Sequence, residues 1–287
     1  MHPKKVIAAL AVLALATLAC SFTVNLPRMD IGDTVTEEIT VPALDESDAI
    51  AEVRLNFAAG QLNLEPGSGD ALISGKATYN VEELKPAVTV RQNEVIVSQE
   101  GEGFDFIPIL GNNVENSWDL RLGMDPMELT IAAGGYQGIF ELGGLSLHSL
   151  RISEGGADTH LSFSDPNPVE MDLLRYETGA SSVIATGLSN ANFERMELVS
   201  GAGNFTLDFS GDLLRDASVS IKSGLSNVTV IVPEGTAARL RVTGGLSNVD
   251  AEGGWRNDGN EYVLEGEGPE LTFTVEMGAG NLELRTE

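Results

Sequence analysis

Beyond residue 48 the chain alternates hydrophobic and polar residues in short segments separated by glycine. The alternation is strictest at 205–209, 228–232 and 271–275, where every second residue is apolar. A period of two with one apolar face is typical of a half-buried β-strand. No stretch of ten or more residues after the first 20 has a helical apolar stripe, so we predict an all-β fold.

Glycines divide the second part of the chain at a regular spacing. Taken from residue 134 onward, the steps between them are 21, 24, 22, 23, 20 and 34 residues, at Gly134, Gly155, Gly179, Gly201, Gly224, Gly244 and Gly278. Such a period predicts repeats that stack, since one repeat cannot bury its own apolar face. We therefore expect a single-stranded β-solenoid with coils of about 20–24 residues. Residues 253–270 lengthen the last step and are expected to form an extra hairpin.

The phrase Gly-x-x-Asn recurs where these coils would turn. Glycine allows positive φ at a corner, and asparagine tolerates the left-handed region and can bond its own backbone. If the asparagines align, their side chains can also form a ladder between coils. We interpret the phrase as structural, and the corner residues are Gly60, Asn63, Gly201, Asn204, Gly224, Asn227, Asn248, Gly278 and Asn281.

The remaining sequence divides by composition. Residues 101–126 are expected to be an irregular connection that packs on the rest, and 36–42 could add an edge strand. The expected organisation is a lipoprotein signal peptide at 1–19, a lipidated N-terminus and extended tether at 20–47, an N-terminal β domain at 48–126, and the solenoid at 127–287.

The N-terminus has the features of an export signal. Lys4 and Lys5 precede an apolar run from Val6 to Ala19, which is short for a membrane span. Cys20 follows at once and is the only cysteine, at the place of the lipidated cysteine in a bacterial lipobox. We expect an exported protein anchored to the bacterial membrane by lipid on Cys20, with its body on the extracytoplasmic side. A plain secretory signal is the alternative.

The net charge of the chain limits the classes of molecule that it is expected to bind. The formal net charge is −26, and removal of Lys4 and Lys5 with the signal makes it −28. Nucleic acids are disfavoured as partners, because binding them depends on neutralising phosphates. The acidity itself indicates solubility, or binding of Ca²⁺ or of basic partners.

No pattern indicates catalysis. His148 and His160 lack a nucleophile-elbow context, and the acidic residues show no paired arrangement. Residues 154–160 and 255–262 match calcium-binding loops only in part, so we expect no cofactor beyond a weak Ca²⁺ site. Four aromatic residues could form a carbohydrate-binding patch, although Trp255 is as well explained as a cap: Tyr136, Tyr176, Trp255 and Tyr262.

Several segments resemble a known family. "VRLNFAAGQLNLEPG", "KATYN" and "KPAVTV" resemble the N-terminal domain of the bacterial toast-rack lipoproteins. "SGAGNFTLDFSGDLLRDASVSI", "SGLSNVTVIVPEG" and "MGAGNLEL" resemble their β-solenoid half and, more distantly, adhesin head domains built of Gly-Asn repeats. The resemblance implies a fold and supplies no catalytic residue.

These observations lead to one leading hypothesis. We expect a non-enzymatic surface module of adhesin type that holds an envelope polysaccharide or a surface protein. The alternatives are an envelope structural or stress-sensing component that acts through a membrane protein, and a polysaccharide-active enzyme.

Overall fold

The structure is a computed structural model that describes residues 30–44, 49–99, 113–245, 248–259 and 261–287. The predicted signal peptide and Cys20 lie outside the described residues. Residues 31–287 form one compact unit. In the described part of the chain no helix is long and apolar enough to cross a membrane.

The prediction of an all-β fold is confirmed. Two short 3-10 turns, η1 (Glu82–Leu84) and η2 (Leu188–Ala191), are the only helical elements among the described residues. All other elements are strands of one sheet: β1 (Val35–Pro42), β2 (Ala51–Pro66), β3 (Ala71–Tyr79), β4 (Pro86–Arg91), β5 (Glu94–Gln99), β6 (Asn116–Leu122), β7 (Met127–Glu141), β8 (Leu147–Ser162), β9 (Met171–Thr186), β10 (Phe193–Asp208), β11 (Ala217–Val232), β12 (Thr236–Gly244), β13 (Asn248–Ala251), β14 (Arg256–Asp258), β15 (Glu261–Leu264) and β16 (Glu267–Thr286).

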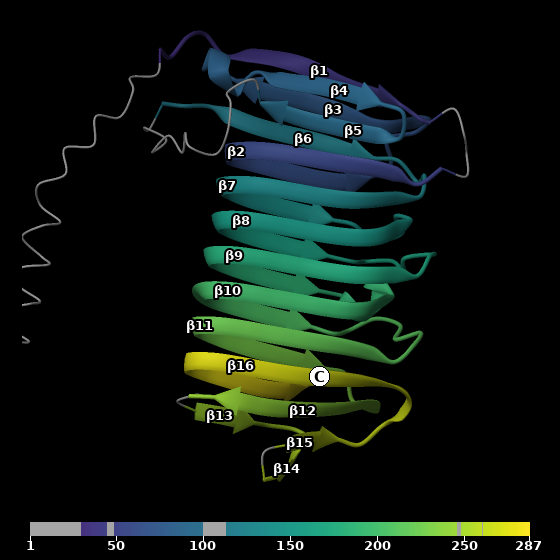
Figure 1. Cartoon of the computed structure of the whole chain (residues 1–287), viewed down its shortest axis with the longest axis vertical. Coiled ribbons are helices and arrows are strands. Elements are labelled where there is room, and N and C mark those ends of the chain that lie inside the picture. Colours follow the sequence, from purple (N-terminus) through teal and green to yellow (C-terminus); the bar gives the residue numbers. More distant parts are fainter. Residues whose placement is uncertain (1–29, 45–48, 100–112, 246–247, 260) are drawn as a thin grey trace, which may run out of the picture. The chain divides into compact units, whose positions relative to one another are not determined.

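The long strands β2, β7–β11 and β16 stack in parallel as coils. Each one bends at its middle, so that one half faces the viewer and the other half lies behind it (Figure 1). Alternate side chains of both halves point inward, and the buried residues form one continuous core from Ile39 to Leu284. The outward side chains of the two halves form two outer faces.

The strand register follows the predicted spacing in the middle of the stack. Leu150 pairs with Leu129, Leu174 with Leu150, Met196 with Leu174, and Val219 with Met196. The steps between coils are thus 21, 24, 22 and 23 residues, as the glycines predict. These side chains form a buried column that continues through Phe273 and Leu240.

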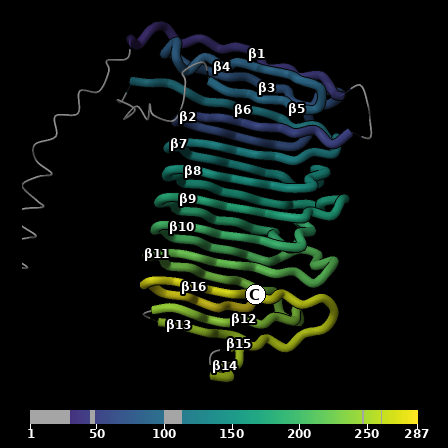
Figure 2. Tube along the Cα trace, in the orientation of Figure 1, coloured from purple at the N-terminus to yellow at the C-terminus, as the bar shows by residue number. Residues whose placement is uncertain are grey.

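The order of the last coils differs from the prediction. The sequence suggested successive stacking, with the coil of Gly244 next to that of Gly224. Instead β16 lies between β11 and the pair β12 and β13, as Figure 2 shows by the yellow strand inside the green ones. The C-terminal strand is therefore paired on both sides, and the short strands β13, β14 and β15 with β12 close the end of the stack. Short strands are a common means of limiting edge-to-edge association.

The N-terminal strands close the other end of the same sheet. β5 pairs with the first half of β2 and β6 with its second half, and antiparallel strands β4, β3 and β1 follow outward. The boundary expected between residues 126 and 127 falls between β6 and β7, and β2 pairs with β7 from Ala51 to Leu64. The segment 36–42, within the expected tether, lies in the edge strand β1.

Part of the expected irregular connection is a strand. Residues 116–122 form β6, and Trp118, Leu120 and Leu122 are buried in alternation. Trp118 packs against Phe57 of β2, with ring centroids 5.1 Å apart. The prediction was wrong here because the neighbouring glycines and asparagines concealed a short segment of period two.

Candidate functional site

The corner glycines stack because the backbones approach closely. A methyl carbon at Gly201 would lie 2.5 Å from the carbonyl oxygen of Gly179, and one at Gly224 would lie 2.5 Å from that of Gly201. Gly278 lies in the same column, where a methyl carbon would be 2.7 Å from the carbonyl oxygen of Gly224. These distances are far below van der Waals contact, so these three positions admit only glycine. The expected reason, positive φ, does not apply to these three glycines.

Positive φ occurs two residues later in the corner. Gly203 has a φ of 151° and Gly280 of 131°, and Gly60 of β2, at 126°, belongs to their column. The strand register places six residues in this column: Gly60, Tyr136 of β7, Ser181, Gly203, Ser226 and Gly280. Only some coils thus use the glycine-favoured conformation at this position.

The asparagines after the corners form a ladder. Asn227 Nδ2 donates to Asn204 Oδ1 at 3.0 Å, and Asn281 Nδ2 donates to Asn227 Oδ1 at 2.9 Å. Asn248 of β13 pairs in register with Asn281. All four side chains are exposed, on the outer face that follows the corners.

Asn63 is not part of this ladder. Because Gly60 occupies the position of Gly203 rather than that of Gly201, the phrase at 60–63 is displaced by two residues. Gln61 takes the ladder position, and Asn63 Nδ2 instead donates to Asp119 Oδ1 at 2.7 Å.

The asparagine ladder is the end of a longer row of polar side chains. The row crosses eleven strands in register, none of its members is buried, and a single acid is its only charged group. We call it the polar row, and the outer face that carries it the ladder face: Thr36, Thr78, Ser117, Gln61, Gln137, Asp158, Ser182, Asn204, Asn227, Asn281 and Asn248.

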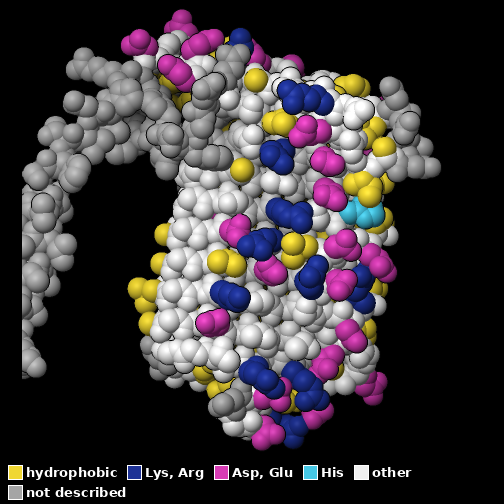
Figure 3. All heavy atoms as spheres, in the orientation of Figure 1, with side chains coloured by type: hydrophobic (Ala, Val, Ile, Leu, Met, Phe, Trp, Pro, Cys, Tyr) yellow, Lys and Arg dark blue, Asp and Glu magenta, His cyan; other side chains and the backbone are white. Residues whose placement is uncertain are grey.

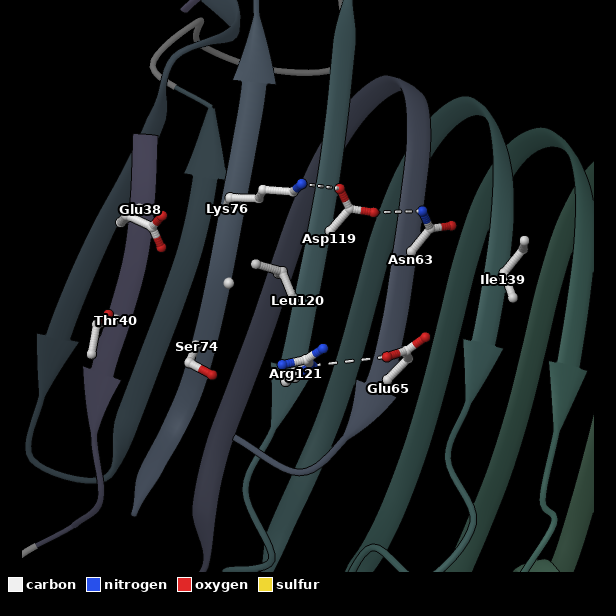
Figure 4. A pocket seen from close by; sticks show the side chains of 11 residues that line it. Glu38, Thr40, Asn63, Glu65, Ser74, Lys76, Asp119, Leu120, Arg121 and Ile139 are labelled. Carbon is white, nitrogen blue, oxygen red and sulfur yellow. Dashed lines mark hydrogen bonds and ion pairs between the residues drawn. The ribbon is translucent and has the colours of Figure 1, made fainter. Parts of the chain in front are cut away.

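The ladder face is hollowed at its N-terminal end. One hollow of about 620 Å³ lies over β1, β3, β6, β2 and β7 (Figure 4). Asp119 stands at its centre, 3.9 Å from Lys76 Nζ and bonded to Asn63, and Ile139 at one side is 60% exposed. A second hollow of about 740 Å³ is lined by Gln61, Ser117 and Gln137 of the polar row. These hollows offer hydrogen-bonding groups beside an apolar contact.

Behind the corners lies a buried polar cluster. Tyr136 Oη donates to Glu154 Oε2 at 2.5 Å, and Ser181 Oγ donates to Glu154 Oε1 at 2.7 Å. Thr178 shares a hydrogen bond of 2.5 Å with Ser181. Burial raises the pKa of Tyr136, and also that of Tyr176 nearby, because the phenolate would be poorly solvated. The buried carboxylate of Glu154 is thus satisfied by hydroxyl donors.

The two segments that match calcium-binding loops in part do not bring their acidic side chains together. In residues 154–160 the side chain of Glu154 points inward, whereas Asp158 is exposed on the polar row. Among the described residues no group of three or more His, Cys, Asp or Glu side chains is placed to hold a metal ion. His160 is exposed and lies in register between Ile139 and Ile184.

The four aromatic candidates do not form a surface patch. Tyr136, Tyr176 and Trp255 are buried, with 6%, 2% and 7% of their surface exposed. Trp255 packs in the core near β14, and its Nε1 donates to the carbonyl oxygen of Arg285. The expected capping role of Trp255 agrees with this position.

Comparison with known proteins gives a family and a fold. The family described as "N-terminal domain of toast_rack, DUF2154" matches residues 30–173. A solved structure described as a "putative cell adhesion protein" from Clostridium sporogenes is 20% identical, with a TM-score of 0.51 over 89% of this chain and 100% of that one. A "putative adhesin" from Bacteroides fragilis is 10% identical, with a TM-score of 0.39 over 88% and 97% of the two chains. No curated protein sequence matches the chain.

Proposed function

The chain belongs to the toast_rack N-terminal domain family, and from this premise we propose that it is a non-enzymatic, lipid-anchored binding module of the bacterial cell envelope. Its partner is an envelope polysaccharide or a surface protein. It binds this partner along the ladder face.

The observation that carries the proposal is the polar row. Neighbouring strands are about 4.8 Å apart, so the row offers a hydroxyl, amide or carboxylate group at each step over eleven strands. Each exposed group exchanges hydrogen bonds with water for those with a ligand at a small net gain. A long partner lying across the strands adds many such gains, whereas a small ligand meets few of them.

Several features support a non-enzymatic role. Four of the ionic groups that line the first hollow form ion pairs with one another, Lys76 with Asp119 and Arg121 with Glu65. His160 has Ile139 and Ile184 on the neighbouring strands. A general base must lie within hydrogen-bond reach of the group it activates, and neither of these two isoleucines offers His160 such a group.

The anchoring part of the proposal rests on Cys20 and the apolar run before it. Replacing Cys20 with Ser should release the protein from the membrane fraction. Mass spectrometry of the N-terminus should show a diacylglycerol-modified cysteine in the wild type. An unmodified Cys20 in a protein released to the medium would contradict the lipid anchor and leave the plain secretory signal.

Binding can be tested with the full chain, purified in detergent and immobilised. Envelope extracts, wall polymer and exopolysaccharide are passed over it with and without EDTA. We expect a retained polymer or surface protein, and a loss with EDTA would implicate Ca²⁺. The variant Gln61→Ala/Gln137→Ala/Ser182→Ala should lose retention. The control Ser220→Ala/Thr272→Ala/Thr274→Ala, on the other outer face, should keep it.

The other outcomes separate the alternatives. Retention of a single membrane protein, unaffected by the row variant, would favour the structural or stress-sensing role. Cleavage of a retained glycan would contradict the non-enzymatic assignment. No retention by any fraction would overturn the binding function.

A further inference from the structure

A short strip of largely apolar side chains crosses the middle of the ladder face. Ile139 of β7, His160 of β8 and Ile184 of β9 lie in register on adjacent strands, two residues after the polar row. Ile139 is 60% exposed and Ile184 is 38% exposed, and His160 between them is also exposed. Neighbouring strands are about 4.8 Å apart, so this central strip is about 10 Å long. A ligand that covers the strip removes apolar surface from water, which favours binding.

Hydrogen-bonding side chains flank the central strip on both sides. On its three strands the polar row precedes it and a second polar row follows it: Gln137, Asp158 and Ser182 on one side, and Glu141, Ser162 and Thr186 on the other. Outward residues along a strand are about 6.6 Å apart, which is twice the rise per residue. The surface therefore offers an apolar line with hydroxyl, amide and carboxylate groups along both of its edges.

The central strip leads into the first hollow at the N-terminal end of the ladder face. Asn63 of β2 is the partner of Ile139 in the register, and Asp119 of β6 is the partner of Asn63. All three residues line the hollow of about 620 Å³, and Figure 4 shows them on neighbouring strands. Asn63 Nδ2 donates to Asp119 Oδ1 at 2.7 Å, so an amide and a carboxylate stand together. Because a hydroxyl group both donates and accepts, two adjacent hydroxyls of a ligand fit such a pair.

Charge is sparse on this part of the ladder face. The strip and its two flanks contain no Lys or Arg, and Glu141 and Asp158 are their only carboxylates. The carboxylate of Glu141 already accepts hydrogen bonds from Ser162, Ser164 and the backbone N–H of Gly143. The opposite outer face, turned to the viewer in Figure 3, instead shows Lys, Arg, Asp and Glu side chains along its length. An acidic polymer would meet Asp158 with no base in these rows, whereas an uncharged ligand meets no such repulsion.

We infer that the central strip and the first hollow bind a neutral polysaccharide laid along the stack, an inference that rests on the binding proposed for the ladder face and names the class of its partner. A pyranose ring presents C–H groups on its faces and hydroxyl groups around its edge. The ring faces cover Ile139, His160 and Ile184, the hydroxyls reach the two flanking rows, and the end of the chain enters the hollow. An extended peptide fits this face less well, because it gains its backbone hydrogen bonds at a sheet edge and these strands are paired on both sides.

The test uses the full chain in detergent and immobilised neutral oligosaccharides of glucose, galactose, mannose and N-acetylglucosamine, with polygalacturonate as the acidic reference. We expect binding to at least one neutral oligosaccharide that changes little as salt is raised, because no ion pair contributes to it. The variant Ile139→Thr/Ile184→Thr keeps β-branched side chains and should weaken this binding by about tenfold or more, equivalent to about 1.4 kcal/mol. The control Val88→Thr/Val90→Thr changes two exposed residues of β4, away from the ladder face, and should change the affinity by less than about twofold.

Other results would overturn the inference. Binding that Ile139→Thr/Ile184→Thr leaves unchanged would place the saccharide elsewhere, and an equal loss in the β4 control would show a general effect of exposed apolar surface. Stronger binding to polygalacturonate than to every neutral oligosaccharide would exclude an uncharged partner. Retention of a surface protein from the envelope extract, with no neutral oligosaccharide bound, would overturn the inference and leave the proposed function intact. Failure to retain either an envelope fraction or an oligosaccharide would overturn both. Circular dichroism of each variant confirms that the fold is retained.

Discussion

The side chain of Asn281 donates a hydrogen bond to Asn227 at 2.9 Å, although 54 residues separate them in the chain. The side chain of Asn227 in turn donates a hydrogen bond to that of Asn204 at 3.0 Å. The ladder can form only because β16 lies directly beside β11, with β12 on the far side of β16. The bond therefore links the C-terminal residues to the middle of the stack.

This strand order predicts unusual protection of the C-terminal strand. A chain end normally frays and exchanges its amide hydrogens quickly. Because β16 pairs with β11 on one side and with β12 and β13 on the other, amides of residues 271–277 should exchange as slowly as those of β11. Amides of β14 and β15 should exchange much earlier. Hydrogen exchange with mass spectrometry measures this, and fast exchange in β16 beside a protected β12 would contradict the order.

The asparagine ladder should contribute modestly to stability. Asn227→Ala removes one donated and one accepted hydrogen bond at an exposed position, so we expect a loss of about 1 kcal/mol in the free energy of unfolding. Urea titration measures the loss. Ser182→Ala, at the same position of β9, serves as the control and should cost less. Equal losses for the two variants would mean that the amide bonds add nothing beyond strand propensity.

The middle of the fold was predictable because the coils from β7 to β11 each have a glycine at the same corner position, where neighbouring backbones approach closely. The spacing from Gly134 to Gly224 therefore reports the coil length directly. The insertion of β16 was not predictable, because β12 and β16 alternate equally well and only tertiary pairing decides their order. Asn63 was misassigned because Gly60 belongs to a different column of the corner, which residue type alone does not reveal.

The polar row was recognised only where its members are asparagines. Gln137, Asp158 and Ser182 each follow the corner glycine of their coil by three residues, as Asn204 follows Gly201. The coil steps would have aligned them, but their side chains differ in type and so form no repeated phrase.

The glycine column should be intolerant of even the smallest side chain. In Gly201→Ala the added methyl carbon would lie 2.5 Å from the Gly179 carbonyl oxygen, which forces neighbouring coils apart. Overpacking of this kind costs about 1–3 kcal/mol. Gly135→Ala, in the corner of β7, places its methyl carbon 3.7 Å from the nearest atom and should be tolerated. Thermal unfolding of the two variants checks the difference, and a wild-type melting temperature for Gly201→Ala would contradict the close approach.

The buried phenols should make the fold sensitive to alkali. Burial raises the pKa of Tyr136 and Tyr176 above the ordinary value of 10.0, so the folded protein keeps two protons that the unfolded chain releases. The contribution is fully present below pH 10 and is lost as the pH rises above it, by about 1.4 kcal/mol per pH unit for each phenol. Urea titrations at increasing pH should show this decline for the wild type.

The double variant Tyr136→Phe/Tyr176→Phe isolates the effect of the two phenols. At neutral pH it should be less stable than the wild type, because Glu154 loses the hydroxyl donor Tyr136. Above about pH 10 its stability should fall less steeply, since neither phenylalanine can release a proton. Tyr262→Phe, at a half-buried position of β15, should keep the wild-type slope. An unchanged slope in the double variant would show that these phenols do not govern the alkaline transition.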